Sequence, residues 1–280
     1  MVDDLAVIGG GTMGIGIAYV SAVAGIATFV VEPSPDRSEA MMREFSEALE
    51  SGLRRGKLSL DDTQRARERV TVLQRIQDIP AGIDVIVESV PERLEVKKAV
   101  LQAAANREPT LLASNTSSMS INILSTFIND PSAFLGLHFF NPVWSIGLVE
   151  VVMGSHSGEP ALRQALDLVS QMGKESAVVA DAPGFATSRL DLVAALEAMR
   201  MVEANVAAAE DIDRAVRLAY RHPVGPLMLS DIVGLDVRLD IAEQLEVSLG
   251  ERFRPPQILR DLVAAGHLGK KTGRGFLVWD

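Results

Sequence analysis

A glycine-rich turn near the start of the chain constrains the fold more than any other feature of the sequence. Apolar residues 5–8 run directly into it, and Gly9, Gly11 and Gly14 stand in the G-x-G-x-x-G spacing. The first glycine permits a tight turn, the second lets a pyrophosphate approach the backbone, and the third lets a helix pack against the strand. We therefore expect a helix over residues 12–24 whose first N–H groups, near Thr12 and Met13, face the phosphates of a dinucleotide.

The residue that ends the next expected strand indicates which dinucleotide the turn holds. The mostly apolar residues 27–31 lead to Glu32, which follows Gly14 by 18 residues. An acidic side chain at this place accepts hydrogen bonds from the ribose hydroxyls and repels an added 2′-phosphate. The sequence therefore favours NAD as the cofactor, while Arg37, a few residues later, keeps NADP open as the alternative.

A histidine and a glutamate form a second group of candidate functional residues. We expect His138 in a loop between two apolar runs, and Glu150 inside a strand over residues 148–152 that is covered on both faces. A buried carboxylate is costly unless a partner meets it. Histidine is a natural partner, because a carboxylate raises its basicity and fixes its tautomer. The two residues therefore predict a device for proton transfer.

Hydroxyl and amide side chains follow another expected strand, over residues 110–113. Residues 114–118 read SNTSS and come directly after it. Ligands bind at the carboxyl ends of parallel strands, so Asn115 and Ser117 are expected to face a crevice. Capping of the next helix is the alternative for one or two of these side chains.

The composition excludes several classes of protein. The chain has 280 residues, 48% of them hydrophobic, and a net charge of −10, which does not suit a general nucleic-acid binder. It has no cysteine, and its four histidines lack a metal-binding spacing, so we expect no metal site. Residues 5–31 are uncharged, but their glycines and the lack of a preceding basic residue favour a buried α/β unit over a membrane span. We expect a cytoplasmic protein without membrane or nucleic-acid partners.

The pattern of strands stops after about residue 183. Residues 1–183 predict a Rossmann-type, doubly wound α/β domain with a mainly parallel sheet, and residues 184–280 predict a smaller all-α domain. The helical part is strongly apolar, which indicates burial against a second copy of itself and hence a homodimer. A basic, glycine-rich segment over residues 269–275 precedes the end of the chain.

These pieces, in this order, resemble the L-3-hydroxyacyl-CoA dehydrogenase family, which includes the bacterial 3-hydroxybutyryl-CoA dehydrogenases. The resemblance covers nearly the whole chain, and its most specific blocks are ASNTSS at 113–118, GLHFFNP at 136–142, LVE at 148–150, PGF at 183–185 and GKKTG at 269–273. It implies reversible, NAD-dependent oxidation of an L-3-hydroxyacyl-CoA to the 3-oxoacyl-CoA.

The resemblance also implies roles for single residues. His138 would be the general base that removes the proton from the 3-hydroxyl group, Glu150 would orient it, and Ser117 would bind the substrate oxygen. CoA would be gripped near Lys57. The cofactor contacts that the resemblance implies beyond the glycine turn and Glu32 are Glu92, Lys97, Asn115, Asn141 and Lys271.

Two positions depart from the family pattern. Ser188 stands where the family has an active-site asparagine, and a serine acts there through water or not at all. Trp144 lies in a loop where the family usually has a second proline and a basic residue; it reshapes the acyl pocket or only covers the loop. These departures keep two alternatives open: a dehydrogenase of a free hydroxy or sugar acid such as L-gulonate, and a non-catalytic NAD-binding protein.

Overall fold

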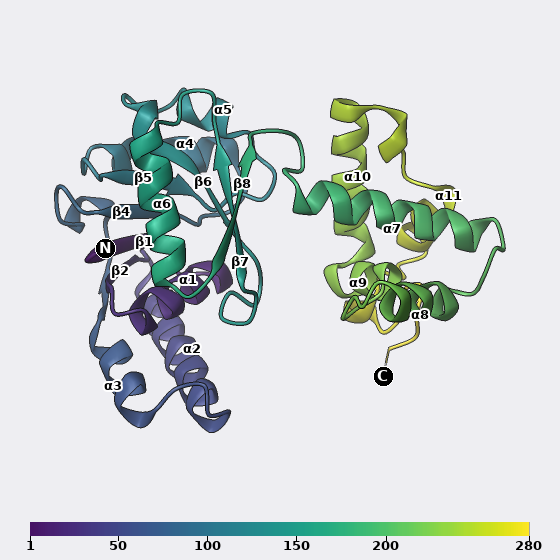
Figure 1. The fold of residues 1–280 in the computed structure, drawn as a ribbon, viewed down its shortest axis with the longest axis horizontal. Coiled ribbons are helices and arrows are strands. Elements are labelled where there is room, and N and C mark those ends of the chain that lie inside the picture. The colour runs from purple at the N-terminus through teal and green to yellow at the C-terminus, as the bar shows by residue number, and fades with distance from the viewer. Residues whose placement is uncertain (280) are drawn as a thin grey trace. The chain divides into compact units, whose positions relative to one another are not determined.

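The chain folds into two compact units. A computed structural model describes residues 1–279 and divides the chain into Met1–Ala182 and a second unit that begins at Pro183 (Figure 1). Within residues 1–279, no helix combines the length and the apolar character needed to cross a membrane.

The first unit contains one sheet of eight strands in the order β3-β2-β1-β4-β5-β6-β7-β8. All neighbouring strands are parallel except β6 and β7, which are antiparallel. This arrangement confirms the predicted Rossmann-type fold with a mainly parallel sheet. The strands are β1 (Asp4–Ile8), β2 (Ala27–Val31), β3 (Val70–Leu73), β4 (Val85–Glu88), β5 (Leu111–Ser114), β6 (Phe134–Phe139), β7 (Leu148–Met153) and β8 (Glu175–Ala180).

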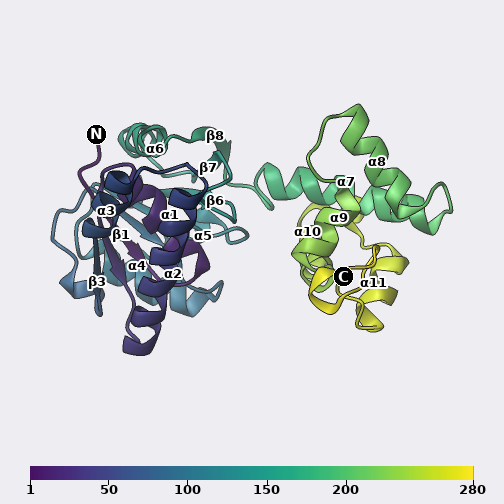
Figure 2. The same ribbon diagram turned by 90° about the horizontal axis from the view of Figure 1, so that it is seen from below.

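Six α-helices accompany this sheet, and capping side chains mark where α2 and α3 begin. Ser34 caps α2 by accepting a hydrogen bond from the N–H of Arg37, and Ser59 and Asp62 form a capping box on α3. Figure 2 shows α1, α2 and α3 side by side, as their mutual contacts require. The helices are α1 (Thr12–Val23), α2 (Pro35–Arg54), α3 (Leu60–Glu68), α4 (Leu94–Ala105), α5 (Ile121–Ser125) and α6 (Glu159–Gln171).

A hydrophobic core is formed between the sheet and helices that include α1, α2 and α6. It contains Ile17 of α1, Phe45 of α2 and Leu168 of α6, together with strand residues such as Val7 and Val151. Helix α1 is buried from Gly14 to Ala22, since it packs against the sheet and against other helices. This packing holds the glycine turn rigidly against the strands that carry the rest of the site.

The second unit is helical and has its own core. Leu196 of α7, Leu245 of α10 and Leu259 of α11 are buried in it. Asp231 holds residues 276–279 against this unit, because its carboxylate accepts hydrogen bonds from the backbone of Phe276 and Leu277 and from the indole of Trp279. The helices are α7 (Thr187–Glu203), α8 (Ala209–Ala219), α9 (Pro226–Val233), α10 (Leu235–Leu249) and α11 (Gln257–Ala264).

Candidate active site

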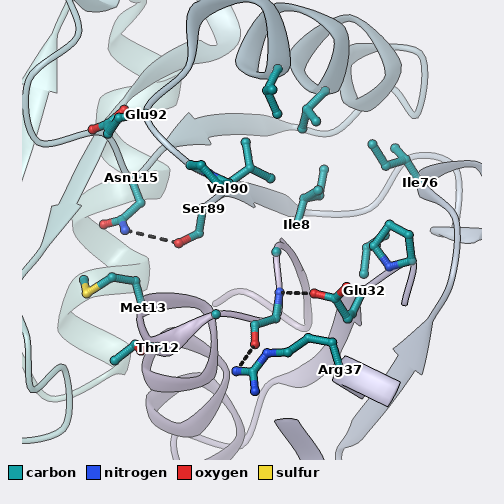
Figure 3. Close-up of a pocket in the computed structure, with 18 of the residues that line it drawn as sticks. Ile8, Thr12, Met13, Glu32, Arg37, Ile76, Ser89, Val90, Glu92 and Asn115 are labelled. Carbon is teal, nitrogen blue, oxygen red and sulfur yellow. Dashed lines mark hydrogen bonds between the residues drawn. The ribbon is translucent and has the colours of Figure 1, made fainter. Parts of the chain in front are cut away.

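A large cavity lies at the carboxyl ends of the parallel strands in the first unit (Figure 3). Its volume is about 1030 Å³, which is ample for a dinucleotide-sized ligand. Ten of the candidate residues predicted from the sequence line it: Gly9, Gly11, Thr12, Met13, Glu32, Glu92, Asn115, Ser117, His138 and Asn141. The fold therefore brings the glycine turn, Ser117 and His138 into one cavity.

The glycine turn has the shape that a pyrophosphate needs. Gly9 adopts a φ of +116°, and a Cβ atom there would lie 2.6 Å from the carbonyl oxygen of Ser89. A Cβ atom on Gly14 would collide with the carbonyl oxygen of Gly9, whereas Gly11 has nothing within 4 Å of its Cβ position. Gly11 is also the N-cap of α1 and offers no side chain to its free N–H groups. The turn thus leaves an open cradle for an anion at a helix N-terminus.

Glu32 and Arg37 lie close together on the wall of the cavity (Figure 3). The Glu32 carboxylate accepts hydrogen bonds from the N–H of Gly10 at 3.2 Å and of Ser34 at 3.1 Å. Arg37 Nη2 donates to the carbonyl of Gly10 at 2.7 Å, and Nη1 pairs with Glu44 at 2.5 Å. The hydrogen bond between them lowers the pKa of the Glu44 carboxyl and raises that of the guanidinium. Arg37 thus lines the cavity and already donates hydrogen bonds to Gly10 and Glu44.

His138 and Glu150 face each other across the antiparallel pair of β6 and β7. Nδ1 of His138 lies 2.8 Å from Oε2 of Glu150, and the glutamate is fully buried. The expected loop position of His138 is wrong, because the histidine is the fifth of six residues in β6. Direct pairing of the strands, rather than a loop, brings the two side chains together.

Glu92 organises the loop that carries Ser117. Its Oε1 atom accepts hydrogen bonds from Thr116 Oγ1 and from the backbone N–H of Ser117, each at 2.8 Å, and lies 3.4 Å from Ser117 Oγ. Because Glu92 and Ser117 both line the cavity, the carboxylate fixes where the serine hydroxyl can point.

A buried ion cluster beneath the cavity supports Glu92. Lys97 is 1% exposed, and its Nζ atom lies 2.7 Å from Glu88 Oε1 and 3.2 Å from Glu92 Oε2. Glu88 also accepts hydrogen bonds from Ser114 Oγ at 2.6 Å and from the N–H of Val90 at 2.7 Å. Lys97 is not among the residues that line the cavity, so its direct contact with a cofactor stays a prediction.

Glu88 is a buried residue that supports the site and that was not predicted from the sequence. It ends the buried strand β4, and it is completely buried. Its signal was the same as that of Glu150, a carboxylate within an apolar strand, with a lysine nine residues later as its partner. A buried carboxylate of this kind requires a partner wherever it occurs.

Asn115 ties neighbouring parts of the cavity wall together. Its Oδ1 atom accepts a hydrogen bond from the backbone of Phe139 at 2.9 Å, and its Nδ2 donates to Ser89 Oγ at 3.3 Å (Figure 3). Asn115 thereby fixes the end of β6, next to His138, relative to the end of β5.

Trp144 lies outside the residues that line this cavity. Its ring packs on that of Tyr19 with centroids 5.6 Å apart, and 37% of the residue is exposed. Lys174 holds the loop by donating to the carbonyls of Val143 and Ile146 at 2.5 and 2.6 Å, and burial lowers the pKa of this lysine. The loop is thus fixed, and a role of Trp144 in substrate choice stays a prediction.

The remaining predicted residues lie elsewhere. Lys57 is exposed beyond the end of α2. Ser188 is in the first turn of α7 in the second unit, and Lys271 in that unit binds both oxygens of Asp236 at 2.6 Å. That contact lowers the pKa of the Asp236 carboxyl.

Each of the two units matches a model of a known protein family. The family model described as "3-hydroxyacyl-CoA dehydrogenase, NAD binding domain" matches residues 4–182. The model described as "3-hydroxyacyl-CoA dehydrogenase, C-terminal domain" matches residues 184–279.

Individual relatives are similar over the full chain. A probable 3-hydroxybutyryl-CoA dehydrogenase from Bacillus subtilis is 35% identical, over 98% of this chain and 96% of that protein. A 3-hydroxyadipyl-CoA dehydrogenase from Escherichia coli is 37% identical, over 99% of this chain and 59% of that protein. The crystal structure of (S)-3-hydroxybutyryl-CoA dehydrogenase from Ralstonia eutropha superposes with a TM-score of 0.95 at 32% identity and covers 100% of both chains.

Proposed function

Since the chain belongs to the 3-hydroxyacyl-CoA dehydrogenase family and is an NAD-dependent oxidoreductase, we propose that His138 is the base of its reaction. The reaction is the reversible oxidation of an L-3-hydroxyacyl-CoA to the 3-oxoacyl-CoA. The observation that carries this assignment is the 2.8 Å contact of His138 with the buried Glu150 on the wall of the cavity that begins at the glycine turn.

In this proposal the proton and the hydride leave the same carbinol group. The hydroxyl proton passes to Nε2 of His138, while Nδ1 stays hydrogen-bonded to Glu150. The glutamate fixes the ring orientation and stabilises the imidazolium that forms. NAD, when bound, supplies the hydride acceptor.

Ser117 is proposed to hydrogen-bond the substrate oxygen, and Glu92 to keep it in place. A donor at that oxygen stabilises the charge that develops on it when hydride is delivered to the 3-oxo group in the reverse direction. The support for this role is the position of Ser117 on the cavity wall and its bonds to Glu92. The bond from the backbone N–H of Ser117 to Glu92 holds the residue at the cavity wall, and in this proposal the hydroxyl turns from Glu92 to donate its one proton to the substrate oxygen.

The helical unit is proposed to contribute Ser188 to the substrate, Lys271 to the cofactor and a surface for a homodimer. Apolar side chains exposed on this unit support the dimer; they include Leu190, Val206, Leu218, Tyr220 and Val247. Sedimentation of the purified 30.1 kDa chain tests it, with a dimer mass expected and a monomer mass contradicting it. We also propose a cytoplasmic location.

A substrate screen tests the proposed reaction. NADH oxidation is followed with 3-oxoacyl-CoA esters of increasing length, beginning with acetoacetyl-CoA, and NAD reduction is followed with free hydroxy and sugar acids. Turnover of at least one CoA ester, with free CoA as a competitive inhibitor, is expected. Turnover of a free acid such as L-gulonate, without turnover of any CoA ester, would show that the substrate is not a CoA ester. Binding of NADH without turnover of any compound would contradict an enzymatic role.

A further inference from the structure

The loop between β6 and β7 carries two large apolar side chains at the surface of the first unit. Trp144 is 37% exposed, and Ile146 is 39% exposed. Neither of them lines the cavity that contains the glycine turn and His138. Tryptophan combines a large flat ring with a polar N–H group and is common where proteins bind partners. The indole of Trp144 is therefore available to a ligand that extends beyond this cavity.

The loop holds Trp144 in a fixed position. Val143 packs so closely against α1 that a Cβ atom on Gly16 would lie 2.6 Å from its Cγ2 atom. Lys174 donates hydrogen bonds to the carbonyls of Val143 and Ile146, which flank the tryptophan on both sides. A ring on such a loop loses little conformational freedom when a ligand stacks on it.

Tyr19 connects Trp144 to the end of α2. The two rings have centroids 5.6 Å apart and planes tilted by 59°. A Cβ atom on Gly52 of α2 would lie 2.7 Å from the Tyr19 hydroxyl oxygen, so the phenol reaches this helix. Burial raises the pKa of Tyr19, and the nearby guanidinium of Arg55 opposes this shift. The indole, the phenol and the end of α2 therefore form one continuous surface.

The end of α2 offers cations that the protein does not neutralise. Arg54 lies 3.9 Å from Glu50, whereas Arg55 donates through Nε to the carbonyl of Ser51 at 3.2 Å. Lys57 is exposed. Within residues 1–279, neither Arg55 nor Lys57 has a carboxylate partner. In a chain with a net charge of −10, two such cations side by side favour the binding of an anion.

A flat aromatic ring beside cations matches the chemistry of a nucleotide, because the base stacks on the ring and the phosphates pair with the cations. The surface is also close to the cavity. Trp144 follows Asn141, which lines the cavity, by three residues, so their Cα atoms are at most about 11 Å apart. A long ligand can therefore place its reacting group in the cavity and a nucleotide on this surface.

We propose that Trp144 stacks on the adenine of CoA while Arg55 and Lys57 bind its phosphates. This inference rests on the proposed function, in which the substrate is a CoA ester. All three residues belong to the first unit, as do Ser117 and His138. In this role Trp144 selects for the nucleotide end of the substrate rather than for its acyl chain.

A matched pair of substrates tests the proposal. Acetoacetyl-CoA and acetoacetyl-pantetheine carry the same reacting group, and only the first has a nucleotide. The wild type is expected to favour the CoA ester in kcat/KM. Trp144→Ala should lower this preference about tenfold, the size of one base–aromatic stack, whereas Trp144→Phe keeps an aromatic face and should retain most of it. Ile146→Ala removes the other exposed apolar side chain of the loop and should leave the preference unchanged.

A binding measurement separates this claim from the proposed reaction. Adenosine 3′,5′-bisphosphate, the nucleotide part of CoA, is titrated calorimetrically into the protein saturated with NADH, which occupies the dinucleotide site. Trp144→Ala should raise its Kd about tenfold, and Arg55→Met should raise it by an amount that shrinks as salt is added. Loss of turnover with an intact Kd would refute only the proposed reaction. A wild type that does not bind the bisphosphate, or a Trp144→Ala variant with the wild-type Kd, would overturn the inference.

Discussion

Nδ1 of His138 lies 2.8 Å from Oε2 of Glu150, across two antiparallel strands that fix the distance through their backbone pairing. The glutamate is fully buried and the histidine lines the cavity, so one side chain is shielded from water while the other can meet a ligand. This relationship makes the pair suitable for transferring one proton to and from a substrate hydroxyl.

Replacing Glu150 by glutamine should slow the reaction while preserving the shape of the strand. The amide cannot stabilise an imidazolium as a carboxylate does, so kcat should fall by about 100-fold, within the usual range of general acid–base catalysis. Steady-state kinetics measure the fall, and fluorescence titration checks that the variant binds NADH. An unchanged kcat would show that the carboxylate has no part in the proton transfer.

Replacing Lys97 by methionine should destabilise the first unit, because it leaves the carboxylate of Glu88 buried without its cation. Breaking a buried pair in this way typically costs about 3–5 kcal/mol in the free energy of unfolding. Urea unfolding measures the loss. The neighbouring Lys98, which lies over the Phe127 ring, is the control, and its methionine variant should lose no more than about 1 kcal/mol.

A double variant distinguishes the cost of the buried unpaired charge from the cost of the packing that Lys97→Met removes. Adding Glu88→Gln to Lys97→Met removes the uncompensated charge and should recover part of the stability. A double variant less stable than Lys97→Met alone would contradict the role assigned to this cluster.

The Arg37–Glu44 pair should contribute stability in a defined range of pH. Arg37 lowers the pKa of Glu44, so the ion pair stabilises the folded state above the ordinary pKa of a glutamate. This contribution disappears as the pH falls through the lowered pKa of the folded state. Because both side chains are partly exposed, the effect at neutral pH should be about 0.2–1 kcal/mol.

Unfolding of the wild type and of Glu44→Gln at a series of pH values checks this sign. The difference in unfolding free energy should be largest near neutrality and vanish in acid. A difference that grows as the pH falls would mean that the pair does not govern the titration of Glu44.

Local signals in the sequence were sufficient to predict the glycine turn. The spacing of Gly9, Gly11 and Gly14 predicts a turn that only glycine can make, and the structure shows why, since side chains at Gly9 and Gly14 would collide with backbone oxygens. The pairing of His138 with Glu150 also followed from the cost of burying a carboxylate. The family match confirms the predicted NAD cofactor.

Features that depend on tertiary contacts could not be predicted from the sequence. The strand β3 has only four residues and is half-buried at the sheet edge, so its short apolar run does not distinguish it as a strand. The placement of His138 within β6 depends on its pairing with β7. Likewise, the ion pair of Arg238 with Asp191 joins two helices that are far apart in the sequence, and no local pattern identifies such partners.

The rate of hydride transfer in a His138→Ala variant tests the central claim most directly. NADH oxidation is measured in single turnovers with the best 3-oxoacyl-CoA of the screen, and His156→Ala, which removes an exposed histidine of the same unit, is the control. We predict a fall of about 100-fold to 10,000-fold for His138→Ala with NADH binding retained, and a normal rate for His156→Ala. A His138→Ala variant that binds NADH and reacts at the rate of the wild type would contradict the account.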